Sequence, residues 1–286
     1  MSLFKKLFID KTAYFENQTA VICLLGTELM DFDTKSIENE IHKYQETASN
    51  VVVEIEQNPS VGQGILLGRV LFEKHIVEIG GVPAPITSAV ANRCITSTAW
   101  DSGIKDRLLQ HNSNIILQYA GASDDGIEQY LALYKVANAL NKGQLIGLIN
   151  EPAWNCHTID WVSGILQPDI MAICKNSPPL HLWAGFLSST LNGRRCFFTR
   201  GFHIFGLSDL ACYQDVNLDG QGIFELFEEV FHYLYFNTDD IQEEDIIKVN
   251  ENQYYILTKP TENEEMLNGI GGCWILSHTT EQESIN

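Results

Sequence analysis

Residues 223–236 read IFELFEEVFHYLYF, and this stretch predicts one long amphipathic helix. At about 100° of rotation per residue, the large apolar side chains fall on one side of the helix. They are Ile223, Leu226, Phe227, Val230, Phe231 and Leu234. The opposite side carries Glu225, Glu228, Glu229 and His232. A helix of this kind must bury its apolar side against other elements, so it predicts a layered fold.

A second helix is predicted from Asp125 onward. Asp125 and Glu128, three residues apart, have the spacing of a capping box. Gly143 follows the apolar repeat, at the point where a left-handed residue ends many helices. Apolar runs elsewhere predict strands, and these lie at 20–25, 51–56, 114–119 and 145–150.

Two hairpins complete this pattern. One joins strands at 65–72 and 75–79, and the other joins 180–187 to 195–199 around Asn192-Gly193, a strong turn signal. Each half of the chain then reads loosely as strand, helix, strand, hairpin and helix. We therefore predict an α+β fold of two similar subdomains with mixed or antiparallel sheets that share an interface.

No linker rich in Pro, Gly or Ser separates the halves, so we expect them to share an interface, and we place the division near 101–113. The expected N-terminal subdomain covers 1–105. The C-terminal subdomain, with an acidic end, covers 106–280, and residues 281–286 form a loose tail.

The negative charge of the chain is concentrated at one end. The formal net charge is −19, and residues 208–286 hold 17 carboxylates against two lysines, whereas residues 1–207 hold 20 against 16 basic side chains. Charge of one sign attracts an opposite partner and repels nucleic acid and anionic membrane. The sequence therefore predicts a basic protein partner and argues against nucleic acid and membrane as ligands.

The cysteines indicate a reducing compartment. All seven lack the Cys-x-x-Cys spacing, and most lie among apolar neighbours, which is typical of buried thiols rather than of disulfides or zinc ligands. No apolar run approaches the roughly 20 residues of a membrane helix, and no secretory signal is recognised at the N-terminus. We expect a cytoplasmic protein.

The acidic side of the 223–236 helix is the first candidate site. It could dock a basic partner, or it could be an ordinary solvated face. The candidate partner-binding residues are Glu225, Glu228, Glu229, His232, Asp239 and Asp240.

A calcium candidate precedes the same helix. Asp215, Asn217 and Asp219, followed by Gly220, begin as a calcium loop does. The twelfth position is Leu226, however, and the nearest acid, Glu225, comes one residue early. In the alternative interpretation Asp219 is a helix N-cap.

A catalytic candidate lies in residues 151–160. Glu151, Cys156 and His157 are the only dense mixture of acid, thiol and imidazole, and they could act as base or nucleophile if a cleft brought them together. Trp154 and Trp161 could equally anchor a purely structural loop. Dinucleotide, Walker-type and hydrolase motifs are absent from the sequence.

The middle of the chain, over about residues 60–250, resembles an uncharacterised bacterial family known only as a domain of unknown function. The resemblance is carried by PAPI at 83–86, Trp100 followed by His111, TRGFHIFGL at 199–207, and the acidic segment before the 223–236 helix. Members often have a Gly-Asp-Thr-type stretch where this chain has TDDI at 238–241. The resemblance implies no established activity, although some such proteins are thought to neutralise toxins.

These observations favour a non-enzymatic interaction protein whose acidic end binds a basic partner, as an immunity-type protein would bind a toxin. The alternatives are an enzyme or small-molecule binder using residues 151–160, and a calcium-stabilised structural protein.

Overall fold

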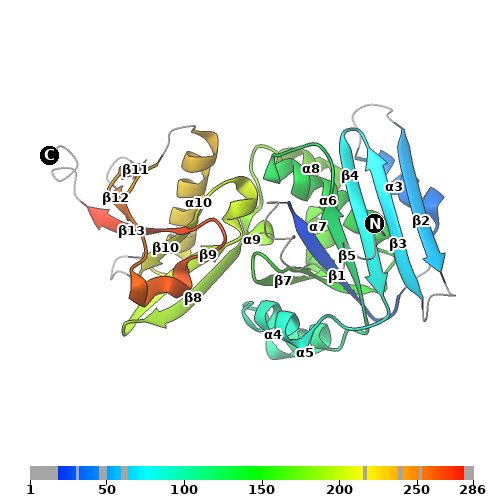
Figure 1. Ribbon diagram of the computed structural model, residues 1–286, viewed down its shortest axis with the longest axis horizontal. Coiled ribbons are helices and arrows are strands. Elements are labelled where there is room, and N and C mark those ends of the chain that lie inside the picture. The colour runs from blue at the N-terminus through cyan, green and yellow to red at the C-terminus, as the bar shows by residue number, and fades with distance from the viewer. Residues whose placement is uncertain are drawn as a thin grey trace. The chain divides into compact units, whose positions relative to one another are not determined.

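The computed structural model describes residues 19–29, 32–44, 50–58, 64–214, 218–237, 241–250 and 253–279. The chain forms two compact units, Met1–Trp183 (unit 1) and Ala184–Asn286 (unit 2). Each unit combines helices with one sheet (Figure 1), so the predicted α+β class is confirmed. Among the described residues, no helix has the length and apolarity needed to cross a membrane.

Unit 1 is built on a seven-stranded sheet in the order β2-β3-β4-β5-β1-β6-β7, with all neighbours antiparallel. The strands are β1 (Val21–Gly26), β2 (Val51–Asn58), β3 (Ile65–Phe72), β4 (His75–Val82), β5 (Ser113–Tyr119), β6 (Leu145–Asn150) and β7 (Asn155–Thr158). The neighbouring strands β1 and β6, both in the interior of the sheet, are buried almost throughout, in keeping with their apolar sequences.

The helices of unit 1 cover this sheet. They are α3 (Thr34–His42), α4 (Ser88–Thr96), α5 (Ser102–Leu109), α6 (Gly126–Leu140), α7 (Ile159–Ile165), α8 (Pro168–Cys174) and α9 (Leu180–Trp183). Helices α4 and α5 share a hydrophobic cluster with residues of β1, β6 and β7. Helix α6 packs along β1, β4 and β5.

Helix α6 begins as the sequence predicts, but only half of the expected capping box forms. The Asp125 side chain accepts hydrogen bonds from the backbone N–H groups of Ile127 and Glu128. The Glu128 carboxylate instead pairs with Lys74, at 2.6 Å. The carboxylate of Glu128 therefore ties α6 to the β3–β4 turn.

The division between the units differs from the one expected near residues 101–113. Strand β5 lies between β4 and β1 and pairs with both, so a boundary at residue 105 would split one continuous sheet. The polypeptide instead passes from one unit to the other at Trp183–Ala184. The expected likeness of two subdomains is also absent from the strand orders, which differ between the units.

Unit 2 has a six-stranded sheet in the order β11-β12-β13-β10-β9-β8. Its strands are β8 (Gly185–Leu191), β9 (Arg194–Arg200), β10 (Asp209–Tyr213), β11 (Ile246–Asn250), β12 (Gln253–Thr258) and β13 (Cys273–Thr279). The β10–β13 pair is parallel and the other pairs are antiparallel, so the sheet is mixed. Short 3₁₀ helices η1 (Phe202–Phe205) and η2 (Glu262–Leu267) connect parts of this sheet.

Helix α10 (Gly220–Phe236) lies alongside this sheet (Figure 1). All six apolar residues that the sequence placed on one side of the helix are buried. Phe231 contacts the rings of Phe202 and Phe205 in η1, with centroids 5.0 and 5.1 Å away. The opposite side of α10 is therefore the side that carries the acidic residues.

The predicted turn at Asn192-Gly193 is confirmed. Both residues have positive φ, 51° and 76°, as the turn of a tight hairpin requires. The hairpin joins β8 to β9, but its first strand begins later than expected, because residues 180–183 form α9.

Candidate functional site

The catalytic candidates of residues 151–160 lie in three different environments. Glu151 is partly exposed and pairs with Arg93, with 2.8 Å between carboxylate oxygen and Nη2. Cys156 and His157 are consecutive residues of β7, so their side chains leave the sheet on opposite faces. Cys156 joins the hydrophobic cluster under α4 and α5, and burial there raises the pKa of its thiol well above the ordinary value.

His157 packs against aromatic rings instead of facing a reactive group. Its ring stacks on Trp161 at 4.6 Å and meets Trp100 edge-on at 6.5 Å. Burial, and secondarily the neighbouring His181, lower the pKa of His157 to about 3. The imidazole is therefore neutral at physiological pH. A neutral thiol and a neutral imidazole on opposite faces do not form a nucleophile–base pair.

Two further histidines, His111 and His203, are buried. The Nε2 atom of His111 accepts a hydrogen bond from the Ile86 backbone N–H at 2.9 Å, while Nδ1 faces the Leu108 carbonyl oxygen at 2.8 Å. His203 is buried in η1, and burial lowers its pKa to about 4.

The outer side of α10 carries a continuous polar and aromatic surface. We define the acidic–aromatic face of α10 as Glu225, Glu228, Glu229, His232, Tyr233 and Phe236. At about 100° per residue, these six positions fall within one side of the helix. The three glutamates occupy its first part, and the aromatic side chains occupy its last turn.

None of the three glutamates forms an ion pair with any residue in the described ranges of the chain. Glu225 and Glu229 are exposed, and Glu228 is half-buried. Burial, followed by the adjacent Glu225 carboxylate, raises the pKa of Glu228. Glu225 accepts one hydrogen bond from Gln221 Nε2, at 2.9 Å. The face thus presents negative charge with no counter-ion among the residues that the structure describes.

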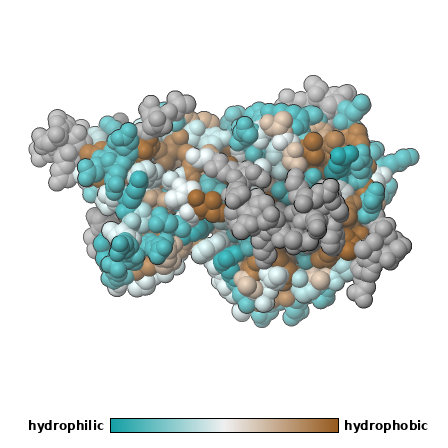
Figure 2. Space-filling model, in the orientation of Figure 1, coloured by the Kyte–Doolittle hydropathy of each residue, from teal (hydrophilic) through white to brown (hydrophobic). Residues whose placement is uncertain are grey.

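The aromatic part of the face is unusually exposed for such large side chains. Phe236 is 56% exposed and Tyr233 is 37% exposed. The His232 ring stacks on Phe236 at 5.8 Å and does not approach Glu228 within ion-pair distance. On the side of unit 2 that Figure 2 shows, hydrophobic residues (brown) lie among hydrophilic ones (teal). Exposed aromatic side chains beside charges are typical of binding surfaces. Asp239 and Asp240 lie outside the described residues.

One of the four residues of the calcium candidate caps a helix. Asp219 is the N-cap of α10, and its carboxylate accepts a hydrogen bond from the Gly222 N–H at 2.9 Å. Asp215 and Asn217 lie outside the described residues. Within the described part of the chain, no cluster of three or more His, Cys, Asp or Glu side chains could hold a metal ion.

A buried ion pair that the sequence analysis missed lies inside unit 2. Arg200 at the end of β9 and Asp209 at the start of β10 are 4% and 1% exposed, and Nη1 lies 3.6 Å from Oδ2. Arg200 also donates hydrogen bonds to the carbonyl oxygens of Thr199, Leu267 and Met266. The pair thereby fastens the end of η2 to the sheet.

Burial outweighs the nearby guanidinium and raises the pKa of Asp209 to about 7. The only sequence signal was the stretch 199–207, which contains Arg200 but stops two residues before its partner. A single buried charge near the end of a strand does not belong to a repeating pattern, so the sequence does not show which residue forms its ion pair.

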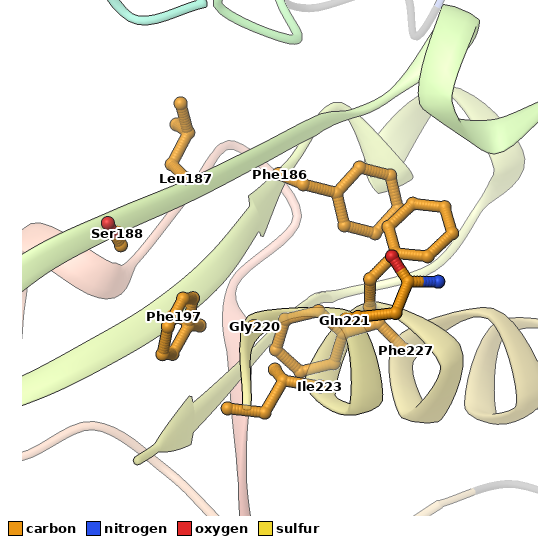
Figure 3. Close-up of a pocket in the computed structure, with 9 residues that line it drawn as sticks. Phe186, Leu187, Ser188, Phe197, Gly220, Gln221, Ile223 and Phe227 are labelled. Carbon is orange, nitrogen blue, oxygen red and sulfur yellow. The ribbon is translucent and has the colours of Figure 1, made fainter. Parts of the chain in front are cut away.

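A second feature that sequence reasoning missed is an apolar pocket of about 270 Å³ between β8, β9 and the first turns of α10. Its lining residues are Phe186, Leu187, Ser188, Phe197, Gly220, Gln221, Ile223, Phe224 and Phe227. Figure 3 shows Phe186 directed from β8 toward the helix. The rings of Phe186 and Phe224 lie 4.5 Å apart, so this contact marks the strand–helix boundary of the pocket.

No protein-family model, no curated protein and no solved structure matches the chain. The resemblance to a family of unknown function therefore stays an expectation based on its motifs. Two of those motifs meet in unit 1, where His111 accepts a hydrogen bond from the Ile86 backbone N–H, and Asn114 Nδ2 next to them donates to the Ala84 carbonyl oxygen at 2.7 Å. They stabilise the loop that precedes α4.

Proposed function

We propose that the protein binds a basic protein partner through the acidic–aromatic face of α10. The observation that supports this most directly is the set of three glutamates without a counter-ion among the described residues, next to the exposed rings of Tyr233 and Phe236. Carboxylates would attract and orient a cationic surface, and the aromatic rings would supply the contacts that dominate binding energy.

The composition of the chain agrees with this proposal. Residues 208–286 hold 17 carboxylates and two lysines, so the local field attracts cations over the whole of this region. The nearby arginines are engaged: Arg194 packs over the Tyr213 ring at 4.5 Å, and Arg195 over the Phe197 ring at 4.9 Å. A cytoplasmic protein that neutralises a basic toxin, in the manner of an immunity protein, is the specific form that we favour.

Residues 151–160 contain no paired nucleophile and base, so we assign no catalytic role to this segment. The neutral thiol of Cys156 and the neutral ring of His157 instead pack as core. We propose no reaction for the protein.

The test compares three proteins as affinity baits in extracts of the source cells, at about 50 and 500 mM salt. The baits are the wild type, the triple variant Glu225→Gln/Glu228→Gln/Glu229→Gln, and a control that removes the same charge from exposed positions of unit 1, Asp106→Asn/Asp124→Asn/Asp169→Asn. The control shows whether binding depends on the acidic–aromatic face of α10 or only on the net charge of the protein.

The proposal predicts one or more basic proteins that the wild type and the control retain at low salt. The triple variant should bind them about 3- to 150-fold more weakly, because each exposed charge pair is worth about 0.2–1 kcal/mol and three pairs sum to about 0.6–3 kcal/mol. Retention that survives 500 mM salt, or that is equal for the triple variant, would refute the proposal. A toxin partner would lose its activity on binding the wild type in a purified assay.

A further inference from the structure

Strand β8 is an edge strand of the unit 2 sheet. It ends the strand order, and no backbone hydrogen bond reaches its outer side from any residue that the structure describes. Its sequence, GFLSSTL, has no charged residue and no proline over seven positions. Proteins usually shield such edges with charges, proline, bulges or very short strands, because an open edge pairs with other chains.

The other three edge strands in the described part of the chain are shielded in these ways. Strand β2 carries Glu54 and Glu56. Strand β7 has only four residues, and β11 carries Lys248. Only β8 offers a long, uncharged row of backbone donors and acceptors. This difference points to an edge that is used for binding.

The apolar pocket lies directly beside this edge. Phe186 and Ser188 of β8 face α10, and Leu187 between them faces the opposite side (Figure 3). The volume of about 270 Å³ exceeds the roughly 150 Å³ of a cavity that accepts benzene. One phenylalanine or leucine side chain of an added strand would therefore fit into the pocket, against the contacting rings of Phe186 and Phe224.

Charges beside the pocket define the chemistry of that strand. On α10, Glu225 follows Gln221 by one turn, and Glu228 follows Phe224 by one turn. Gln221 and Phe224 line the pocket, so both carboxylates lie one turn beyond it along the helix. Neither has a cation partner among the described residues. A segment that fills the pocket would place lysine or arginine side chains beside them.

We propose that the basic partner is recognised through an extended cationic segment, which adds to β8 as a further strand and inserts one apolar side chain into the pocket. This inference rests on the proposed function, because it uses the same acidic side of α10. Main-chain hydrogen bonds to β8 would supply affinity, and the pocket together with Glu225 and Glu228 would supply selectivity.

The test uses linear ten-residue peptides displayed on phage, selected against the full-length wild type. The pocket is blocked in the variant Gly220→Leu. A Cβ atom at Gly220 would lie 3.7 Å from the Phe197 ring, in ordinary contact, so the longer side chain enters the pocket without a backbone clash. The matched control is Gly164→Leu in α7, where a Cβ atom meets nothing within 4 Å.

We expect enriched peptides to carry a large apolar residue flanked by lysine or arginine. Binding to the Gly164→Leu variant should equal that of the wild type. Binding to the Gly220→Leu variant should be at least tenfold weaker, as expected when one buried apolar side chain is lost. Backbone N-methylation of the best peptide should weaken binding at alternate residues only, since one edge of a strand pairs with β8.

Several results would overturn the inference. These are no enrichment, enrichment of neutral or acidic peptides, equal binding to the Gly220→Leu variant, or N-methyl effects without alternation. A wild-type dimer in sedimentation that the Gly220→Leu substitution dissociates would show that a second copy occupies the edge, which also contradicts the inference.

Failure of this inference and failure of the proposed function give different results. If a basic protein is captured through the three glutamates but binds the Gly220→Leu variant fully, the proposed function stands and only the strand-addition mode is wrong. If no basic protein is captured in a salt-dependent manner, the proposed function itself is wrong.

Discussion

Replacing Arg200 by methionine should destabilise unit 2 strongly. The substitution removes the partner of a carboxylate that is 1% exposed, together with the donor to the carbonyl oxygens of Thr199, Met266 and Leu267. Breaking a buried pair by removing one member costs about 3–5 kcal/mol. A domain is stable by only about 5–15 kcal/mol, so the loss is a large fraction of the total.

The loss should depend on pH in a defined direction. Burial raises the pKa of Asp209 to about 7, and removing the guanidinium takes away the main interaction that lowers it. Asp209 in the folded variant would therefore bind its proton more tightly than in the unfolded chain, where its pKa has the ordinary value of 3.8. The free energy of unfolding of the variant should then fall as pH rises from about 4 to above 7. The defect should be smaller at pH 5, where Asp209 is protonated, than at pH 8.

Two further variants separate the charge from the hydrogen bonds. In the double variant Arg200→Met/Asp209→Asn the unpaired carboxylate is gone, so stability should recover in part. Arg200→Lys keeps the charge but lacks the forked donors that reach several oxygens, so it should lie between the wild type and Arg200→Met.

Urea unfolding gives the free energies, and hydrogen exchange followed by mass spectrometry locates the change. Peptides that cover residues 262–279 should lose protection in the Arg200→Met variant, because its side chain holds the end of η2. Unchanged protection there, with a change in stability below about 0.5 kcal/mol, would refute this account of the buried pair.

The remaining predictions concern unit 1, the calcium candidate and the thiols. The pKa of His157 is about 3 in the folded protein and about 6.5 in the unfolded chain, so the wild type should lose about 2 kcal/mol of stability as pH falls from 7 to 5. The His157→Phe variant has no such group and should lose about 2 kcal/mol less over the same range. An unchanged difference between urea midpoints at pH 7 and 5 would contradict this. Calcium at millimolar concentration should leave the melting temperature unmoved, since Asp219 caps α10 and the closing position is Leu226; a concentration-dependent rise would contradict it. A thiol reagent should label none of the seven buried cysteines in the native protein within minutes and all seven in urea; rapid labelling without denaturant would show an exposed thiol.

Local signals in the sequence predicted individual elements well. Residues 223–236 identified the buried side of α10, because a helical period in large apolar residues has only one geometric solution. Asp125 located the start of α6, and Asn192-Gly193 located the β8–β9 turn, because both signals act on the backbone within a few residues.

Pairing between distant segments could not be predicted in the same way. Strand β5 lies between β4 and β1, which are about 50 residues apart in the sequence. Because this pairing was not foreseen, the division between the units was expected at 101–113, whereas the structure has it after Trp183. Strand β7 was missed because four residues are too few to establish alternation.

Only the charged part of the candidate site could be predicted from the sequence. The carboxylates of α10 are visible in the sequence, since a charged side faces away from a buried one. The pocket beside β8 needs Phe186 and Phe224 to meet from a strand and a helix, and the pairing of Arg200 with Asp209 needs two strand ends to meet. Both depend on the order of strands in the sheet rather than on spacing along the chain.

The position of β13 has a consequence for synthesis on the ribosome. This strand, the last in the described chain, lies between β12 and β10 in the interior of its sheet. A nascent chain that has not yet extruded residues 273–279 therefore exposes two unsatisfied strand edges at once. We expect the second half of the polypeptide to depend on chaperone protection until Thr279 has left the exit tunnel.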